Sequence, residues 1–394
     1  MKGVASYILI ALGILLILAA ILWWAVAVNA LVKLPDDVNV ENKYEGEVTY
    51  FVDPNTGEPL APGSELKLPL NIEQDIVSDA GQYDSSTGVI KETIIVEVMG
   101  IAQDDVENSY VLDRKSMENK NDDQGRAYAF KTATFDGEEM KRDGSYYPQF
   151  PIDSSKDGTY SYWKNEVNEG VEAEFVEEVD KEGVTVYSYR LTFENKEVTE
   201  GYIEQMGLPT QTTFEELKPT LLAAGVDMDG FLALASQVMS PDDLQALNAA
   251  LQQSIPLDYY WTMDQELSIE PKTGTPVDLY KNLETLTTQF DANSLQEVSG
   301  ILAEYTADPI LGPAIAQLSD LQTQLAGAQK IFEQNYVTTE ETRKTAIDDS
   351  KDYAGQINLI KVYVPWALLI VGAFILIIGL LIGGGQAAPQ QAEE

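Results

Sequence analysis

Three short motifs could together form the active site of a serine acyltransferase. Ser161 and Lys164 would supply a nucleophile and its base, with residues 272–274 (Lys-Thr-Gly) and 280–282 (Tyr-Lys-Asn) as further polar groups. This chemistry needs the serine and the lysine on one face of a helix, three residues apart. Residues 160–163 instead have the aromatic composition of a strand, in which Ser161 and Lys164 point to opposite faces. The motifs therefore argue against acyl transfer.

A second group of residues imitates the first half of a calcium-binding loop. Asp153 and Asp157 place oxygen ligands at alternating positions before Gly158, as such a loop does. The twelfth position is Lys164, where a bidentate glutamate is required. Residues 119–125 form a similar and weaker pattern. We expect structural turns at both places and no metal site, with Asp153 and Asp157 as weak candidates.

Histidine and cysteine are both absent from the sequence. This excludes Ser-His-Asp and Cys-His catalysis and an ordinary zinc site. Paired carboxylates of the glycosidase type stay open because 64 residues are acidic, but no spacing marks two of them. We expect a protein that is not an enzyme and uses no cofactor; a carboxylate-dependent hydrolase is the third hypothesis.

Aromatic residues are the candidates for lining a ligand cavity. Core packing is the competing explanation for each of them. The candidates are Tyr147, Tyr160, Tyr162, Trp163, Tyr259, Tyr260 and Trp261.

Two apolar stretches near the ends of the chain are long enough to anchor the segment between them in a membrane. Tyr7–Val32 contains no charged residue over 26 positions, and residues 362–382 form a second uncharged run. Both are long enough to cross a bilayer as helices. A cleaved signal peptide is the alternative for the first, because residues 28–30 could form a cleavage site, but the run exceeds the apolar core of such peptides. We predict transmembrane helices at 7–32 and 362–382.

The orientation of these helices follows from the long segment between them, since long domains are exported largely regardless of charge. We therefore predict that residues 1–6 and the tail 383–394 are cytoplasmic and that the ectodomain lies outside the cell membrane. Gly379 and Gly383 form a G-x-x-x-G motif that could pack against Gly13 or residues 19–20 of the first helix.

The segment between the helices is strongly acidic. Of the 25 Lys and Arg and 64 Asp and Glu residues, all but Lys2, Glu393 and Glu394 lie between residues 33 and 361. Such a surface repels nucleic acid and anionic headgroups, so we expect no nucleic-acid partner. We interpret the charge as a solvated surface that suits a high-salt habitat or simply keeps the protein soluble, with cation binding as the alternative. The oligomeric state is not predicted.

Most of the ectodomain, residues 33–211, reads as antiparallel strands joined by turns, because runs rich in β-branched and aromatic residues recur between turn residues. One turn formula occurs twice, first with Asp53, Pro54 and Gly57 and again with Pro271 and Gly274. Proline fixes φ and glycine accepts a positive φ in such turns. We interpret the two copies as equivalent structural hairpins.

The remaining ectodomain alternates between helix and strand. We predict helices over 212–254, a β-hairpin returning to the sheet over 255–290, helices again over 291–337, and a juxtamembrane helix over 338–361. Leu318, Leu321, Leu325, Ala328 and Phe332 step by three and four, as in a helix-packing seam. The predicted fold is α+β: an antiparallel β-rich ectodomain with a helical cap, between two transmembrane helices.

This arrangement resembles a known family. The terminal helices, the segment Tyr44–Pro59 and the run 147–153 leading to 160–163 are similar to the porin PorA family of prokaryotic membrane proteins, a domain of unknown function. The resemblance is strongest at 1–60, 126–200 and 256–285. It implies topology more than function, because an outer-membrane pore needs many lipid-facing strands, whereas these spans are helical.

Two looser likenesses concern architecture alone. Class B scavenger receptors also have short cytoplasmic ends, two spans and a β-rich ectodomain, which passes lipid through a tunnel. The paired turns are also similar to those of LolA-like lipoprotein carriers.

The leading hypothesis is a non-catalytic, membrane-anchored extracytoplasmic protein that binds a lipid or another envelope ligand in a sheet-lined cavity, with the bilayer as its other partner. The alternative is a structural or adhesion protein of the cell surface without a ligand pocket.

Overall fold

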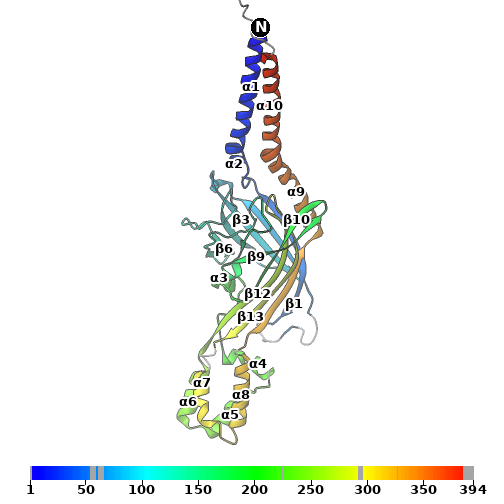
Figure 1. Ribbon diagram of the computed structural model, residues 1–394. Helices are drawn as coiled ribbons and strands as arrows, with labels where there is room; N and C mark the ends of the chain where they lie inside the picture. The colour runs from blue at the N-terminus through cyan, green and yellow to red at the C-terminus, as the bar shows by residue number, and fades with distance from the viewer. Residues whose placement is uncertain are drawn as a thin grey trace, which may run out of the picture.

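The computed structural model describes residues 2–53, 59–60, 66–223, 225–291, 296–325 and 327–384. Three parts follow one another along an elongated molecule (Figure 1): a pair of long helices, a strongly curved sheet, and a small group of helices at the far end. The predicted fold class, α+β with an apolar helix at each end, is confirmed.

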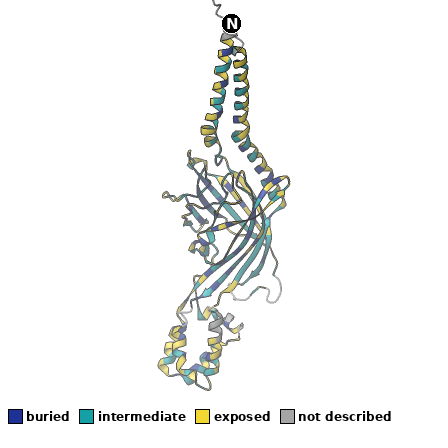
Figure 2. Cartoon of the chain, viewed as in Figure 1, coloured by how far each residue is buried: buried dark blue, intermediate teal, exposed yellow. Residues whose placement is uncertain are grey.

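The helix pair contains both candidate membrane spans, Val4–Leu31 and the apolar part of the helical stretch Glu340–Gly383. The first comprises α1 (Lys2–Leu22), a π-helical turn η1 (Trp23–Ala27) and α2 (Val28–Leu31). The second comprises α9 (Glu340–Asn358), a π-helical turn η6 (Leu359–Tyr363) and α10 (Val364–Gly384). Both apolar helices leave many large apolar side chains exposed (Figure 2), as helices that contact lipid do.

The two π-helical turns lie side by side and are joined by tryptophan side chains. Trp23 Nε1 donates to the carbonyl of Ile360 at 2.9 Å, and Trp24 Nε1 donates to that of Lys361 at 2.9 Å. These two bonds hold the helices together where the sheet begins.

Fourteen strands of the described chain form one sheet. Each strand pairs antiparallel with its neighbours in the order given next. The order is β7-β6-β5-β3-β2-β1-β14-β13-β12-β10-β9-β8, with β4 beside β3 and β11 beside β12. The strands are β1 (Asn39–Phe51), β2 (Leu68–Ser78), β3 (Thr87–Val98), β4 (Ile101–Ala102), β5 (Val106–Asp113), β6 (Tyr128–Lys131), β7 (Glu138–Glu139), β8 (Tyr160–Lys164), β9 (Glu169–Lys181), β10 (Val184–Glu197), β11 (Gln211–Thr213), β12 (Ser254–Glu270), β13 (Thr275–Phe290) and β14 (Gln329–Thr338).

The sheet closes on itself through an irregular segment between β5 and β8. Leu112 of β5 bridges Asn119, Glu118 bridges Tyr146, and Tyr146 bridges Tyr162 of β8. Tyr146 donates its amide to the carbonyl of Ser161 at 2.7 Å. We call the result the closed sheet, since strands far apart in the strand order become neighbours around it.

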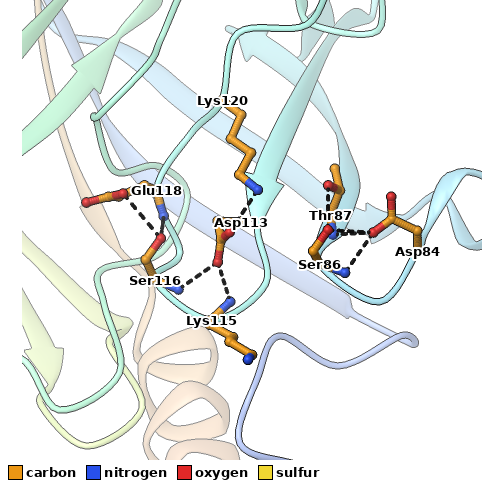
Figure 3. Close-up of polar contacts among 8 residues, drawn as sticks. All are labelled: Asp84, Ser86, Thr87, Asp113, Lys115, Ser116, Glu118 and Lys120. Carbon is orange, nitrogen blue, oxygen red and sulfur yellow. Dashed lines mark hydrogen bonds and ion pairs between the residues drawn. The ribbon is translucent and has the colours of Figure 1, made fainter. Parts of the chain in front are cut away.

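Two loops, one before β3 and one after β5, are each capped by an acidic side chain (Figure 3). Asp113 accepts the amides of Lys115 and Ser116 at 2.8 and 3.0 Å and pairs with Lys120 at 2.8 Å. Burial opposes ionisation of Asp113, but these donors outweigh it and lower its pKa to about 2. Asp84 likewise accepts two following amides at 2.7 Å in the loop before β3, and these bonds lower its pKa.

The distal helices form a module with its own apolar core. They are α4 (Phe214–Ala223), α5 (Met228–Val238), α6 (Pro241–Leu251), α7 (Gln296–Leu302) and α8 (Gly312–Leu325), while the short α3 (Glu200–Gln205) lies beside the sheet. α6 has a well-capped start, because Ser240 Oγ accepts the amide of Asp243 at 3.2 Å and Pro241 occupies the first turn. The two helical blocks pack on each other beyond the distal ends of β12 and β13, and not over a face of the sheet (Figure 1).

The prediction of helix up to residue 337 is wrong at its end. Residues 329–338 form β14, between β1 and β13. Phe332 therefore belongs to a strand, although its spacing from Leu325 and Ala328 fits a helix. Ile331, Phe332, Tyr336 and Val337 are β-formers, and pairing with β1 and β13 on both edges outweighs the short helical spacing.

Of the two copies of the turn formula, only the second lies wholly within the described residues. Pro54 and Gly57 lie outside the described residues, and Asp53 directly follows the bridge residue Val52. The second copy joins β12 to β13, with Gly274 at φ 75° and its amide donating to Glu270 at 2.8 Å. A β-carbon there would lie 2.1 Å from the carbonyl oxygen of Phe150, so this turn requires glycine.

Candidate functional site

A cavity of about 1150 Å³ lies inside the closed sheet. Its wall is made by alternate residues of neighbouring strands. In β2, Leu70, Ile72, Gln74 and Ile76 are buried while the residues between them are exposed. The side-chain period of a strand is two, so this pattern directs one set of side chains into the interior. The same alternation continues in β1, β3 and β14, while β13 contributes the consecutive residues Thr275–Leu279 and, further along, Glu284.

Apolar side chains line the cavity near both ends of the sheet; at the end nearest the helix pair, the polar side chains of Asp278, Thr338, Thr342 and Asp349 lie among them. Toward the distal module it is lined by Phe51, Leu68, Val98 and Phe332. Toward the helix pair it is lined by Val38, Ile76, Ile90, Val277 and Leu279. Polar side chains cluster between these two apolar zones.

Glu92 is the centre of the first polar cluster. It is fully buried, and its carboxylate accepts hydrogen bonds from Asn108 Nδ2 at 2.8 Å and from the Tyr110 hydroxyl at 2.7 Å. Its other oxygen accepts from Gln74 Nε2 and the Tyr147 hydroxyl. Burial first, and then the charge of Glu92, raises the pKa of Tyr147 and Tyr110 well above the ordinary value. Both phenols therefore stay protonated and serve as donors.

A second polar cluster lies on β12, β13 and β14. Glu284 accepts from the Tyr336 hydroxyl at 3.0 Å and from Gln334 Nε2 at 2.6 Å. Gln265 is 5% exposed and lines the cavity, and its Oε1 has no hydrogen-bond partner among the described residues. A buried amide oxygen without a partner is uncommon, so the wall presents an acceptor to whatever occupies the cavity.

Glu166 completes this second cluster. It also lines the cavity, and burial raises its pKa; Lys164 acts in the opposite direction, and Glu284 adds to the increase. We define the polar belt as Gln74, Glu92, Asn108, Tyr147, Glu166, Gln265, Glu284, Gln334 and Tyr336.

The belt is rich in carboxylates and poor in cations. Of the described residues that line the cavity, Lys164 is the only lysine or arginine. Arg142 lies behind the wall, with its guanidinium 4.1 Å from the Tyr110 ring centroid, and it donates to the carbonyls of Ser109 and Tyr128 at 2.6 and 3.0 Å. The arginine is thus committed to the protein, and the cavity interior favours neutral or cationic groups.

The seven aromatic candidates lie in three different places. Tyr147, Tyr162 and Trp163 line the cavity. Tyr160, Tyr259 and Trp261 are buried in the adjoining apolar core instead, where Tyr259 donates to the carbonyl of Pro209 at 2.7 Å. Tyr260 lies on the opposite face of β12 from Tyr259 and Trp261 and is partly exposed.

Of the catalytic and metal-site candidates from the sequence, Lys164 lines the cavity, whereas Asp153, Asp157, Ser161 and Lys272 do not. Asp153 pairs with Lys361 of η6, and Asp157 is exposed in the same loop. Ser161 and Lys164 lie on β8, a strand as predicted. Lys272 lies in the β12–β13 turn and donates to Asn358 Oδ1 at 3.2 Å.

The glycines of the G-x-x-x-G motif lie at the interface of α1 and α10. A β-carbon on Gly379 would lie 2.9 Å from the backbone nitrogen of Ile10, and one on Gly383 would lie 2.5 Å from Ser6 Oγ. Ser6 also donates to the carbonyl of Gly379 at 2.6 Å. Gly13, which we expected opposite this motif, lies against Gly372 instead. Gly379 and Gly383 therefore contact α1 at Ile10 and Ser6, about one and two helical turns before Gly13.

Apart from Tyr147, the polar belt was not anticipated from the sequence. A signal for Glu92 exists, because it lies in phase with Ile90, Ile94 and Val96, where a strand facing a core has apolar residues. A charged residue at an inward position therefore marks a functional or structural exception.

The comparisons with known proteins agree with this architecture. No curated protein matches the chain. A family model described as Porin PorA matches residues 5–381, which include both apolar helices and the whole sheet. Such a match and two candidate spans indicate a membrane or cell-envelope protein. The chain belongs to the porin PorA family.

Proposed function

We propose that this protein is a membrane-anchored, non-catalytic binding protein that holds a lipid or another amphipathic envelope ligand in the cavity of the closed sheet. The observation that carries the proposal is the order of the cavity wall: apolar, polar, apolar along the strands. An amphipathic molecule matches such a wall, because its chains can occupy an apolar zone while its polar group reaches the belt.

The size of the cavity supports a chain-like ligand. Val40 and Phe51 of β1 both line it, and so do Ile90 and Val98 of β3. At about 3.3 Å per residue these stretches span about 26–36 Å. The volume of 1150 Å³ over that length corresponds to a cross-section of about 30–45 Å². This suits one or two extended hydrocarbon chains better than a compact solute.

The charge of the belt supports selection of the polar group. Glu92, Glu166 and Glu284 face Lys164 as the single described cation of the wall. An anionic headgroup would be repelled at close range in a poorly hydrated interior. We therefore infer a ligand whose polar group is neutral or cationic and carries hydrogen-bond donors, for which Gln265 Oε1 is an unpaired acceptor.

The anchor supports an extracytoplasmic site. The N-terminal end of α1 and the C-terminal end of α10 lie at the far end of the helix pair, away from the sheet (Figure 1). With the long central segment exported, both termini are cytoplasmic and the cavity stands outside the cell membrane, in reach of envelope lipids.

Native mass spectrometry of the detergent-purified full chain tests this proposal. The expected result is a retained lipid that remains bound when the detergent is removed. Ile94→Trp places a large side chain in the cavity and should reduce retained lipid at least fivefold. Ile95→Trp, on the outer face of the same strand, is the matched control and should retain it. If the wild-type chain carries no lipid, or if Ile94→Trp retains as much as Ile95→Trp, a structural or adhesion role becomes the better explanation.

A further inference from the structure

The closed sheet has an opening in its wall at the end nearest the helix pair. β14 pairs with β1 from Tyr44 onward and with β13 from Leu283 onward. β14 ends at Thr338. Thr338 still reaches β13, where its Oγ1 accepts the amide of Leu279 at 2.8 Å. Within the described chain, residues 39–43 of β1 and 275–278 of β13 therefore have no strand between them. The first turns of α9 occupy this position instead of a strand.

The start of α9 is fixed at both sides of the opening. Thr339 caps the helix and donates its amide to the carbonyl of Lys43 at 3.0 Å. Thr342 Oγ1 accepts the amide of Lys43 at 3.0 Å. On the other side, Ile347 is fully buried against Val277 and the first residues of β10. The helix thus frames the opening and does not depend on the ligand for its position.

The cavity reaches this opening. Thr342, Ala346 and Asp349 lie on one face of α9, four and three residues apart, and all three line the cavity together with Val40 and Val277 of the flanking strands. The wall there is made of small or medium side chains, and Asp349 is exposed. We call this opening, defined by Val40, Val277, Thr342, Ala346 and Asp349, the side portal.

The side portal lies close to the membrane surface. Lys361 at the start of the apolar helix pairs with Asp153, and Tyr353 donates to the carbonyl of Lys33 at 3.0 Å. These contacts hold the base of the sheet at the level of Asn358–Lys361. Asp349 precedes Asn358 by nine residues, which is about 14 Å along the helix axis. That distance is close to half of the ~30 Å hydrocarbon core of a bilayer, so a lipid raised by one chain length reaches the opening.

From this geometry we infer that lipid enters the cavity from the bilayer through the side portal, along α9, and that the protein extracts lipid from its own membrane. The inference rests on the proposed function and adds a path and a source to it. The acidic side chain of Asp349 lies at the opening and repels anionic headgroups there. The entry path therefore has the same charge preference as the polar belt inside the cavity.

Because the chain contains no cysteine, each end of the cavity can be blocked after folding. Asp349→Cys places a thiol at the side portal, and Gln103→Cys places one at the distal end of the cavity. Lys344→Cys is the matched control on α9: it is exposed and does not line the cavity. Each purified full-length variant is coupled to a polyethylene glycol maleimide or left uncoupled, and then reconstituted.

The vesicles consist of phosphatidylcholine with a small fraction of phosphatidylcholine that carries a diazirine on one acyl chain. After irradiation, proteolysis and mass spectrometry locate the adducts. Adducts on β3 and β14 report lipid that has entered the cavity, and adducts on α1 and α10 report lipid in the bilayer. Coupling at Asp349→Cys should reduce the cavity adducts at least fivefold and leave the bilayer adducts unchanged. Coupling at Lys344→Cys or Gln103→Cys should change the cavity adducts less than twofold.

The outcomes separate the two proposals. Equal cavity adducts with and without the label at Asp349→Cys overturn the side portal but leave lipid binding in place. Loss of the adducts on coupling at Gln103→Cys alone also overturns it, because lipid then enters from the distal end. Absence of cavity adducts in every uncoupled protein, with bilayer adducts present, overturns the proposed function itself.

Discussion

Replacing Glu92 by glutamine tests whether the polar belt stabilises the closed sheet as well as facing the ligand. The carboxylate joins three strands and the closing segment, because its four donors come from Gln74 of β2, Asn108 and Tyr110 of β5, and Tyr147. Glutamine has nearly the same size and keeps one acceptor oxygen. The other position becomes an amide nitrogen, which faces two donors.

The expected loss follows from these bonds. A hydrogen bond to a charged group contributes about 1.5–3 kcal/mol, so two lost bonds cost about 3–6 kcal/mol. The Tyr110 hydroxyl, which also accepts from Asn165 Nδ2 at 2.9 Å, can turn and accept from the new amide, and a neutral side chain is cheaper to bury. These two effects offset about 1–2 kcal/mol. We expect Glu92→Gln to lower the free energy of unfolding by about 2–4 kcal/mol.

Denaturant unfolding of the full chain in detergent, followed by tryptophan fluorescence, measures this loss. Glu97→Gln is the control, since Glu97 is on the same strand and does not line the cavity; a surface change of this kind shifts stability by about 0.5 kcal/mol or less. Tyr147→Phe removes one donor, and its cost should shrink when Glu92 is already glutamine. A Glu92→Gln protein as stable as the Glu97→Gln control would refute the account of Glu92 as the tie between these strands.

Three further predictions concern other parts of the fold. Gly274→Ala should lower the free energy of unfolding by more than about 3 kcal/mol, because its β-carbon would lie 2.1 Å from the carbonyl oxygen of Phe150. Gly183 also has a positive φ but has open space around it, so Gly183→Ala should cost only about 1–2 kcal/mol. Chemical denaturation of both variants measures the difference. Glu166→Gln should raise the midpoint of thermal unfolding at pH 7 and leave it unchanged near pH 4. Burial raises the pKa of the Glu166 carboxyl, so this group contributes stability below its unfolded pKa and that stability is lost as the pH rises through the folded pKa. Equal midpoints of the variant and the wild-type chain at pH 7 would contradict this. Gly379→Leu should separate α1 from α10, which cross-linking between cysteines placed on the two helices detects as a lower yield than in the parent pair.

The parts of this fold that the sequence predicts are those with a strong local signal. The apolar runs at 7–32 and 362–382 need only length and absence of charge, and both lie in long helices of the structure. The hairpin turn at residues 180–183, which connects β9 to β10, has an equally local signal, because its turn residues and the alternation beside it are adjacent in the chain.

The strand β14 shows where such local signals fail. Residues 318–332 contain apolar residues at helical spacing, and the helix does extend to Leu325. What makes 329–338 a strand is the pair of neighbours β1 and β13, which are distant in sequence. The preference of a central strand for its position is a tertiary effect, so no window of ten residues contains it.

The polar belt required the same distant information. Glu92 and Glu284 are far apart in the chain and face one cavity only because the closed sheet turns both inward. Each could be noticed as a charge on the apolar face of its own strand. Both carboxylates line one cavity, in which Lys164 is the only described lysine. This arrangement depends on the strand order and register of the sheet, which the sequence pattern does not contain.

The side portal depends on where one strand stops. If β14 continued beyond Thr338, it would fill the space between β1 and β13 and close the wall. Instead the chain reaches Thr339, whose side chain caps a helix, and Glu340 and Glu341 follow in the first turn, where acidic residues favour the helix dipole. The change from strand to helix at this point has two effects at once. It leaves the wall open beside the cavity, and it produces the helix that leads directly into the second membrane span. The opening and the path from the bilayer therefore have a common local cause in residues 338–341, and extending β14 by replacing this cap would be expected to remove both.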